Sequence, residues 1–191
     1  RRMQRIVDDL LDLSRIESGG WVPLPESLDM GQFAGEAITA AGQAASEKGV
    51  LLTAEVAPDA TSVHADPTAL RQILGNLVHN AVRYTAPGGK VHIFTESRAD
   101  GVLVGVRDTG SGIAAEHLPR IFERFYRADP ARSRDEGGTG LGLAIVRHLV
   151  EAHGGRIQAD STPGRGTTIT ALFPRPTQGT TAPATDGSPA R

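Results

Sequence analysis

Residues 76–85 read NLVHNAVRYT, a stretch in which two asparagines lie one turn apart within an apolar helical rhythm. The helix is expected to begin after Asp66, a favourable N-cap, with Pro67 at its first position. At roughly 100° per residue, Asn76, Asn80 and Arg83 fall within about 60° of one another. The apolar residues that form the predicted buried face lie on a separate arc: Leu70, Ile73, Leu74, Leu77, Val78 and Ala81.

The polar face of this helix has two interpretations. Carboxamide oxygens are neutral hard ligands that suit Mg²⁺ when water and phosphate oxygens fill its other positions. An arginine beside them would neutralise phosphate charge through charge-assisted hydrogen bonds. An ordinary solvated face accounts for the same residues, and the helix alone does not separate the two interpretations.

A second motif, DTGSGI at 108–113, follows the mostly apolar strand GVLVGVRD. Burial of Asp108 at the end of such a strand would be costly without a partner. A carboxylate only accepts hydrogen bonds, so it suits the exocyclic amine of adenine and rejects the carbonyl of guanine. The alternative is an ordinary Asp-Gly turn.

A third motif, GGTGLGLAIV at 137–146, joins a glycine run to a helix start, where free N–H groups attract phosphate. It is neither a Walker A loop nor a dinucleotide-binding GxGxxG motif, and a flexible turn is the plainer explanation. The preceding segment, IFERFYRADPARSRDEGG at 121–138, could close over a nucleotide as a lid. Its aromatic residues Phe122, Phe125 and Tyr126 could equally pack in the core.

The composition limits the classes of function. The 191 residues suffice for one domain with short appendages, and the formal net charge of −2 provides no bulk attraction for nucleic acid or anionic lipid. The absence of cysteine excludes disulfides and thiolate metal sites. No apolar run reaches the length of a membrane span, and no signal-peptide pattern is present.

The order of the predicted elements indicates the fold class. Helices are expected at 2–18, 31–48, from Pro67 through Arg83, and at 140–155, and strands at 27–30, 50–56, 90–97, 101–108, 156–161 and 166–174. The hairpin formed by 90–97 and 101–108 argues for a mixed sheet with helices stacked on one face.

The motifs in their order along the chain resemble the ATP-binding domain of sensor histidine kinases. NLVHNAVRYT, DTGSGI, IFERFYR, GTGLGLAIV and GTTITALFP correspond to the N box, first glycine box, F box, second glycine box and final glycine-threonine stretch. The resemblance covers residues 27–174. It implies an α+β Bergerat fold, a two-layer α/β sandwich with a mixed sheet of about five strands, and ATP with Mg²⁺ as ligands.

The resemblance also implies a role for each matching residue. Asn80 would be the Mg²⁺ ligand, with Asn76 supporting phosphate or metal, and Arg83 stands where the family usually has lysine. Asp108 would select adenine, and Thr168 would close the adenine site. Arg124 and Arg127 would reach the terminal phosphate, which makes Asn76, Asn80, Arg83, Arg124 and Arg127 the catalytic set. The remaining nucleotide contacts would come from Tyr84, Gly110, Gly112, Ile113, Gly138, Thr139, Gly140, Leu141 and Gly142, although the Leu141 side chain is also expected to pack the helix.

The same resemblance implies a domain organisation. Residues 1–20 resemble the end of the second helix of a dimerisation hairpin, 21–26 are a linker, 27–174 the catalytic domain and 175–191 a disordered tail. The helix with the phosphate-accepting histidine is absent, so the partners would be that dimerisation domain and a response-regulator receiver domain. The resemblance implies a homodimeric full-length parent at the inner membrane, with this domain in the cytoplasm. No contact of this segment with nucleic acid or membrane is expected.

Two other functions share this fold. ATPase clamps such as gyrase B, MutL and Hsp90 resemble one another in carrying a glutamate one turn before the metal-binding asparagine, as do serine kinases of the anti-sigma type. Here that position is Asn76, and a carboxamide cannot accept a proton at neutral pH. The sequence therefore favours a kinase over a clamp, and a non-catalytic adenine-nucleotide sensor is the third alternative.

Overall fold

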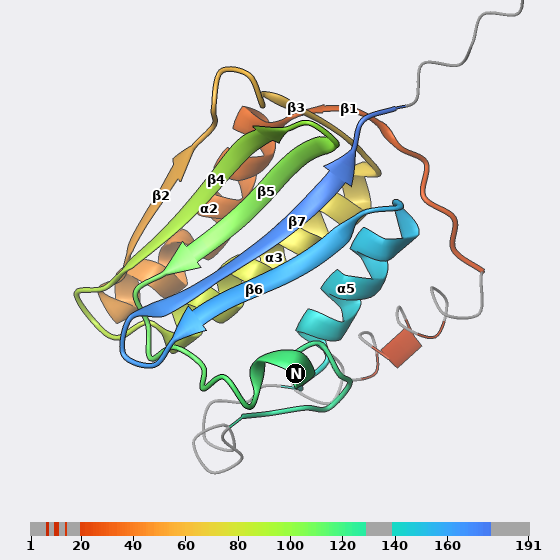
Figure 1. Cartoon of the computed structure of the whole chain (residues 1–191). Helices are drawn as coiled ribbons and strands as arrows, with labels where there is room; N and C mark the ends of the chain where they lie inside the picture. The colour runs from red at the N-terminus through yellow and green to blue at the C-terminus, as the bar shows by residue number, and fades with distance from the viewer. Residues whose placement is uncertain (1–6, 8–9, 12–13, 15–19, 129–138, 177–191) are drawn as a thin grey trace, which may run out of the picture.

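A five-stranded mixed sheet forms the centre of the computed structural model, which describes residues 20–128 and 139–176 together with residues 7, 10, 11 and 14 (Figure 1). The strands lie in the order β2-β4-β5-β7-β6. Their bounds are β2 Leu51–Glu55, β4 Lys90–Arg98, β5 Gly101–Asp108, β6 Arg156–Thr162 and β7 Gly166–Pro174. Only β2 and β4 pair in parallel; the other neighbours are antiparallel.

Helices cover one face of this sheet and leave the other face open (Figure 1). They are α2 Met30–Lys48, α3 Pro67–Tyr84 and α5 Gly142–Ala152, with a short 3₁₀ turn, η1, at Leu118–Arg120. This two-layer arrangement confirms the predicted α+β fold class and the predicted mixed sheet of about five strands.

The predicted face of α3 is the centre of the core. Leu70, Ile73, Leu74 and Leu77 are at most 2% exposed, and Val78 and Ala81 are buried beside them. Each large apolar side chain buried in this way contributes about 1.5–3 kcal/mol relative to exposure. Asp66 caps the helix as predicted, because its Oδ1 accepts hydrogen bonds from the backbone N–H groups of Thr68 at 2.9 Å and Ala69 at 3.0 Å.

A second, two-stranded sheet was not predicted in full. The strand expected at 27–30 is β1 Glu26–Asp29, and it pairs with β3 Ser62–Ala65, for which no strand was predicted. β3 has only four residues and ends at the cap of α3, so it offers too short an alternation to recognise. Met30 starts α2 instead of ending β1, because Asp29 accepts a hydrogen bond from Gln32 N at 2.8 Å.

The alternation of side chains along β5 and β7 decides which residues face the helices. Val106 pairs with Ile169, and both are buried on the helix side of the sheet. By the two-residue period of a strand, Asp108 and Thr167 lie on that same side. Arg107 and its partner Thr168 lie on the open side.

Several predictions concern segments at the ends of the chain. Residues 7, 10, 11 and 14 are helical, whereas most of the predicted helix at 2–18 and the tail from residue 177 onward lie outside the described residues. Among the described residues, no helix is both long and apolar enough to cross a membrane.

Candidate functional site

The asparagine face of α3 meets the beginning of α5. Asn76 and Asn80 are half-buried. A Cβ added to Gly142 would lie 3.0 Å from Asn76 Oδ1, so the first residue of α5 packs directly against this carboxamide. The structure therefore brings the second glycine motif to the asparagine motif, although 66 positions separate the two residues in the numbering.

The C-terminal end of α3 meets the first glycine motif. Ser111 N donates a hydrogen bond to the carbonyl oxygen of Tyr84 at 3.2 Å. A Cβ at Gly110 would lie only 2.4 Å from that same oxygen, so only glycine fits there without a shift of the backbone. Tyr84 is 47% exposed, and the guanidinium carbon of Arg83 lies 5.3 Å from the centroid of its ring.

Asp108 is held by one of its two carboxylate oxygens. Oδ1 accepts hydrogen bonds from Gly110 N at 2.8 Å and from Thr167 N at 3.2 Å. Burial raises the pKa of Asp108, and these two N–H donors only partly oppose that effect. Because no hydrogen bond between described residues uses Oδ2, this oxygen is the acceptor that a ligand would meet.

The glycine loop is anchored on β6 and on the β6–β7 turn. Gly112 has φ of 68°, and a Cβ there would lie 2.1 Å from the carbonyl oxygen of Thr162. Ile113 N donates a hydrogen bond to Ser161 Oγ at 2.8 Å. The predicted residues Gly110, Gly112 and Ile113 are therefore brought to Asp108 by contacts on both sides of the loop.

The F-box segment is joined to Gly140, two residues before α5 begins. Phe125 N donates a hydrogen bond to the carbonyl oxygen of Gly140 at 2.9 Å, and both residues have positive φ, 61° for Phe125 and 73° for Gly140. Arg124 is exposed, whereas Arg127 is half-buried. Arg127 Nη2 is buried and makes no hydrogen bond within the described part of the chain. Gly138 lies outside the described residues.

The structure corrects the prediction for Thr168. Its side chain lies on the open face, where Arg107 Nε donates a hydrogen bond to Thr168 Oγ1 at 3.3 Å. Thr167 lies on the face that carries Asp108. A shift of one residue along a strand moves a side chain to the other face, and the apolar alternation of Ile169, Ala171 and Phe173 already indicated which threonine faces inward.

The structure confirms the expected packing of the Leu141 side chain, and a nucleotide contact through the backbone of this residue stays a prediction. Leu141 is 0% exposed and belongs to the hydrophobic core, where it packs α5 as expected. Its backbone N–H donates to Thr139 Oγ1 at 3.2 Å. α5 begins at Gly142, later than predicted, because the positive φ of Gly140 is incompatible with a right-handed helix.

Two residues of this region were missed by sequence reasoning. Thr167 and Ser161 face each other across β7 and β6, with their hydroxyl oxygens 2.9 Å apart. The alternation of β7 was the signal for Thr167. Ser161 had no comparable signal, because its role depends on the pairing of two strands.

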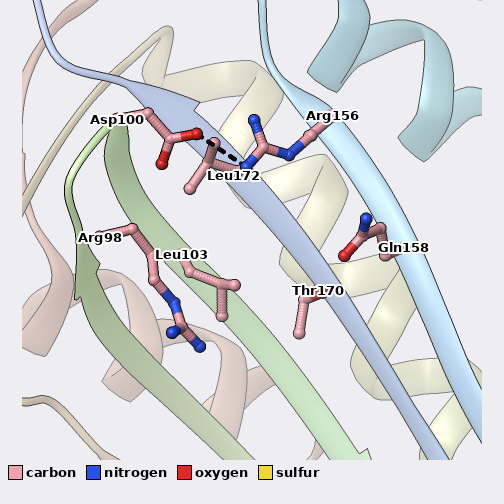
Figure 2. Close-up of a pocket in the computed structure, with 7 residues that line it drawn as sticks. All are labelled: Arg98, Asp100, Leu103, Arg156, Gln158, Thr170 and Leu172. Carbon is pink, nitrogen blue, oxygen red and sulfur yellow. Dashed lines mark ion pairs between the residues drawn. The ribbon is translucent and has the colours of Figure 1, made fainter.

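A hollow of about 260 Å³ lies on the opposite, open face of the sheet (Figure 2). Figure 2 shows Arg156 directed toward Asp100, and the two side chains form an ion pair at 2.7 Å. Both partners are at least half exposed. None of the predicted site residues lines this hollow; its lining is Arg98, Asp100, Leu103, Arg156, Gln158, Thr170 and Leu172.

A known protein family matches the part of the chain that carries this candidate site. Residues 65–177 match the family model described as histidine kinase-, DNA gyrase B-, and HSP90-like ATPase. The matched range contains α3, both glycine motifs and β7.

Named relatives point to one branch of that family. The chain is 38% identical over 173 residues to the sensor-like histidine kinase SenX3 of Mycolicibacterium smegmatis, covering 91% of this chain and 45% of the relative. It is also 38% identical over 173 residues to the sensor histidine kinase CusS of Escherichia coli O157:H7, covering 91% of this chain and 35% of that relative. The chain thus spans less than half the length of these curated relatives.

Solved structures share the fold. Full-length ShkA in complex with AMPPNP superposes with a TM-score of 0.80 at 31% identity, over 90% of this chain and 35% of that one. The mycobacterial sensor histidine kinase MprB gives a TM-score of 0.67 at 28% identity, over 79% of this chain and 97% of that one. The chain belongs to the histidine kinase-, DNA gyrase B-, and HSP90-like ATPase family, and its named relatives within that family are sensor histidine kinases.

Proposed function

We propose that this domain binds Mg-ATP and transfers the γ-phosphoryl group to a histidine on a dimerisation helix, for relay to an aspartate of a response regulator. The observation that carries this proposal is the residue one turn before Asn80. It is Asn76, whose carboxamide packs against Gly142, so the phosphate end has an amide where a hydrolytic clamp would carry a carboxylate base.

The adenine end of the proposed site is built around Asp108. Its Oδ2 is the acceptor for the exocyclic amine, and Gly110 and Gly112 allow the loop to approach the ligand closely. Thr167 replaces Thr168 in this proposal, because it shares the face of Asp108 and donates its backbone N–H to that carboxylate. Tyr84 and Ile113 flank this end of the site.

The phosphate end of the proposed site combines α3, the F box and the start of α5. Asn80 would hold Mg²⁺, with Asn76 and Arg83 beside it on the helix. The buried Nη2 of Arg127 fits a phosphate group, since a buried guanidinium nitrogen without a hydrogen bond among the described residues is costly unless a ligand satisfies it. Thr139, Gly140 and Gly142 lie at the junction that would cradle the phosphates, and Arg124 would act from the exposed side.

The chemistry asked of this chain is positioning and charge neutralisation. When bound, Mg²⁺ supplies charge neutralisation at the phosphate oxygens. Asp108 orients the base, while Arg127 and Arg124 compensate charge at the far end of the triphosphate. In the transfer, the bond from the γ-phosphorus to the bridging oxygen breaks, a bond to the imidazole nitrogen forms, and ADP leaves. The imidazole proton passes to an acidic residue beside the acceptor histidine, outside this chain.

The whole protein follows from the same proposal. Residues 1–20 would end the dimerisation hairpin and residues 21–26 would link it to the catalytic domain at 27–174, followed by the tail at 175–191. The parent would be a homodimer at the inner membrane, with this domain in the cytoplasm beside its response regulator.

The direct test mixes this chain with γ-labelled ATP and a separate hairpin that carries the acceptor histidine. Acid-labile, base-stable label on the hairpin supports a kinase, and a hairpin with that histidine replaced by glutamine must stay unlabelled. Release of free phosphate without a labelled hairpin supports an ATPase clamp. Nucleotide binding with neither product supports a sensor and contradicts the proposed transfer.

A further inference from the structure

Ser161 is the point at which three parts of the adenine end meet. It lies on β6, half-buried, on the helix side of the sheet. Its Oγ is 2.8 Å from Ile113 N in the glycine loop, 2.9 Å from Gly166 O at the start of β7, and 2.9 Å from Thr167 Oγ1.

The proton positions in this cluster follow from donor and acceptor counts. A serine hydroxyl has one proton to donate and two lone pairs to accept with. Ile113 N–H can only donate, so it takes one lone pair, and Gly166 O can only accept, so it takes the Ser161 proton. If the Ser161 proton pointed at Thr167 instead, Ser161 Oγ and the carbonyl oxygen of Gly166 would lie 2.9 Å apart without a proton between them.

Ser161 Oγ therefore has one lone pair left, and the hydroxyl of Thr167 must donate its proton to that lone pair. The Thr167 hydroxyl is then an acceptor toward everything else. Thr167 N donates to Asp108 Oδ1 at 3.2 Å, so this hydroxyl stands beside the carboxylate that takes the adenine amine in the proposed function. The floor of the adenine end thus presents acceptors at two positions.

We propose that Ser161 is a positioning residue that orients the Thr167 hydroxyl as an acceptor and thereby strengthens selection of adenine over guanine. An exocyclic amine donates two hydrogen bonds and suits two acceptors, whereas the guanine carbonyl at that position donates none and is repelled. This inference rests on the proposed function, because it concerns the base that the same site accepts.

The substitution Ser161→Ala releases the Thr167 proton, which can then turn toward a ligand carbonyl. We expect the ratio of ATP affinity to GTP affinity to fall by about fivefold, the effect of one ordinary hydrogen bond. Ser161→Thr keeps the hydroxyl and is expected to restore the ratio. Ser27→Ala is the matched control, because Ser27 Oγ also bonds another hydroxyl, that of Ser62 at 2.6 Å, away from the site.

A double-mutant cycle separates orientation from simple support of the fold. Thr167→Val removes the hydroxyl that Ser161 orients, so it should lower the ATP-to-GTP ratio by itself, and adding Ser161→Ala should change the ratio no further. Both affinities are measured by equilibrium titration of each variant in the presence of Mg²⁺, with thermal unfolding recorded in parallel.

The outcomes are distinguishable. An unchanged ratio in both Ser161→Ala and Thr167→Val overturns the inference, as does an equal loss of affinity for both nucleotides. If Ser161→Ala does not fold, the Thr167→Val ratio alone decides. If the unsubstituted domain binds neither nucleotide, the proposed function itself fails. If it binds ATP with a ratio insensitive to these variants, only the inference about Ser161 fails.

Discussion

In the proposed function, Asp108 serves ligand binding at a cost to the stability of the ligand-free domain. Its Oδ1 is satisfied by two backbone N–H groups, whereas Oδ2 accepts no hydrogen bond among the described residues, and burial raises the pKa of the carboxyl. The folded domain without ligand therefore holds the charged form less well than the unfolded chain does. Such conflicts between stability and function are expected at binding sites.

The substitution Asp108→Asn tests this conflict. An asparagine carbonyl can keep both backbone hydrogen bonds without a buried charge, so the Tm of the ligand-free domain should rise at pH 7 while ATP affinity falls at least tenfold. A raised pKa in the fold means that the penalty is absent below the unfolded pKa of about 3.9 and develops as pH rises through the folded pKa. Thermal unfolding from pH 3.5 to 8 should therefore show the gain in Tm disappearing at the acid end. A lower Tm at pH 7, or unaltered ATP affinity, would contradict this assignment.

The fit of Gly110 against α3 gives a second test. A Cβ there would meet the carbonyl oxygen of Tyr84 at 2.4 Å, so Gly110→Ala should lower the free energy of unfolding by about 1–3 kcal/mol. Gly35→Ala is the control, because nothing lies within 4 Å of its added Cβ in α2, and removing a helical glycine should stabilise by about 0.5–1 kcal/mol. Urea unfolding of both variants measures the difference. Equal effects would show that the end of α3 does not confine the loop.

At the scale of elements, α3 serves both the core and the site. Its apolar side is buried and its other side carries Asn76, Asn80 and Arg83. Its cap, Asp66, also holds the segment before β1, because Leu24 N donates to Asp66 Oδ2 at 3.2 Å. Trp21 packs near His153 with a centroid distance of 6.0 Å, and His153 Nε2 accepts from Asp66 N at 2.9 Å. The cap of α3 thus also holds the described residues that precede β1.

Asp66→Ala should destabilise the domain more than the loss of an ordinary cap. Burial opposes ionisation of Asp66, but hydrogen bonds from the N–H groups of Ala69, Leu24 and Thr68, with a contribution from His153, outweigh it and lower its pKa. We expect a loss of about 1–2 kcal/mol at pH 7. Because the folded pKa is lowered, this contribution exists above the unfolded pKa and disappears as pH falls through the folded pKa.

The matched control for this cap is Asp29→Ala in α2. Asp29 accepts one backbone hydrogen bond, from Gln32 N, and lies at an exposed position. Its removal should reduce the free energy of unfolding by less than removal of Asp66. Denaturation curves at pH 7 and pH 3 decide, and a loss for Asp29→Ala equal to that for Asp66→Ala would contradict the special role of the α3 cap.

The elements also show what a sequence can predict. The cap, start and buried face of α3 were predicted correctly, because N-capping and helical periodicity are local properties. β3 was missed because its four residues depend on pairing with β1. Thr168 was assigned in place of Thr167 because the motif alone does not show which of the two threonines faces the helix side of β7. Ser161 was missed because only the pairing of β6 with β7 brings it beside Thr167. The order of motifs predicted the family, whereas these local errors concern contacts between distant segments.

At the scale of the molecule, the sheet separates two surfaces with different chemistry. The helix side holds the proposed nucleotide site, with Asp108 at one end and the Asn76–Gly142 contact at the other. The open side holds exposed ion pairs such as Arg156–Asp100, which lines the hollow of about 260 Å³ (Figure 2). Exposed ion pairs contribute about 0–1 kcal/mol, so these pairs add little to the stability of the fold.

The central claim is that Asn80 holds the magnesium ion of a bound adenine nucleotide. The most direct measurement is equilibrium titration of ATP into the domain with Mg²⁺ and with chelator, for the unsubstituted chain, Asn80→Ala and the control Gln43→Ala, an exposed carboxamide in α2. We expect Asn80→Ala to weaken Mg-ATP binding by about tenfold or more, since loss of even an outer-shell partner of a metal ligand reduces affinity 10- to 100-fold. Its affinities with and without Mg²⁺ should become nearly equal, while Gln43→Ala behaves as the unsubstituted chain. Full retention of the Mg²⁺ dependence in Asn80→Ala would contradict the claim.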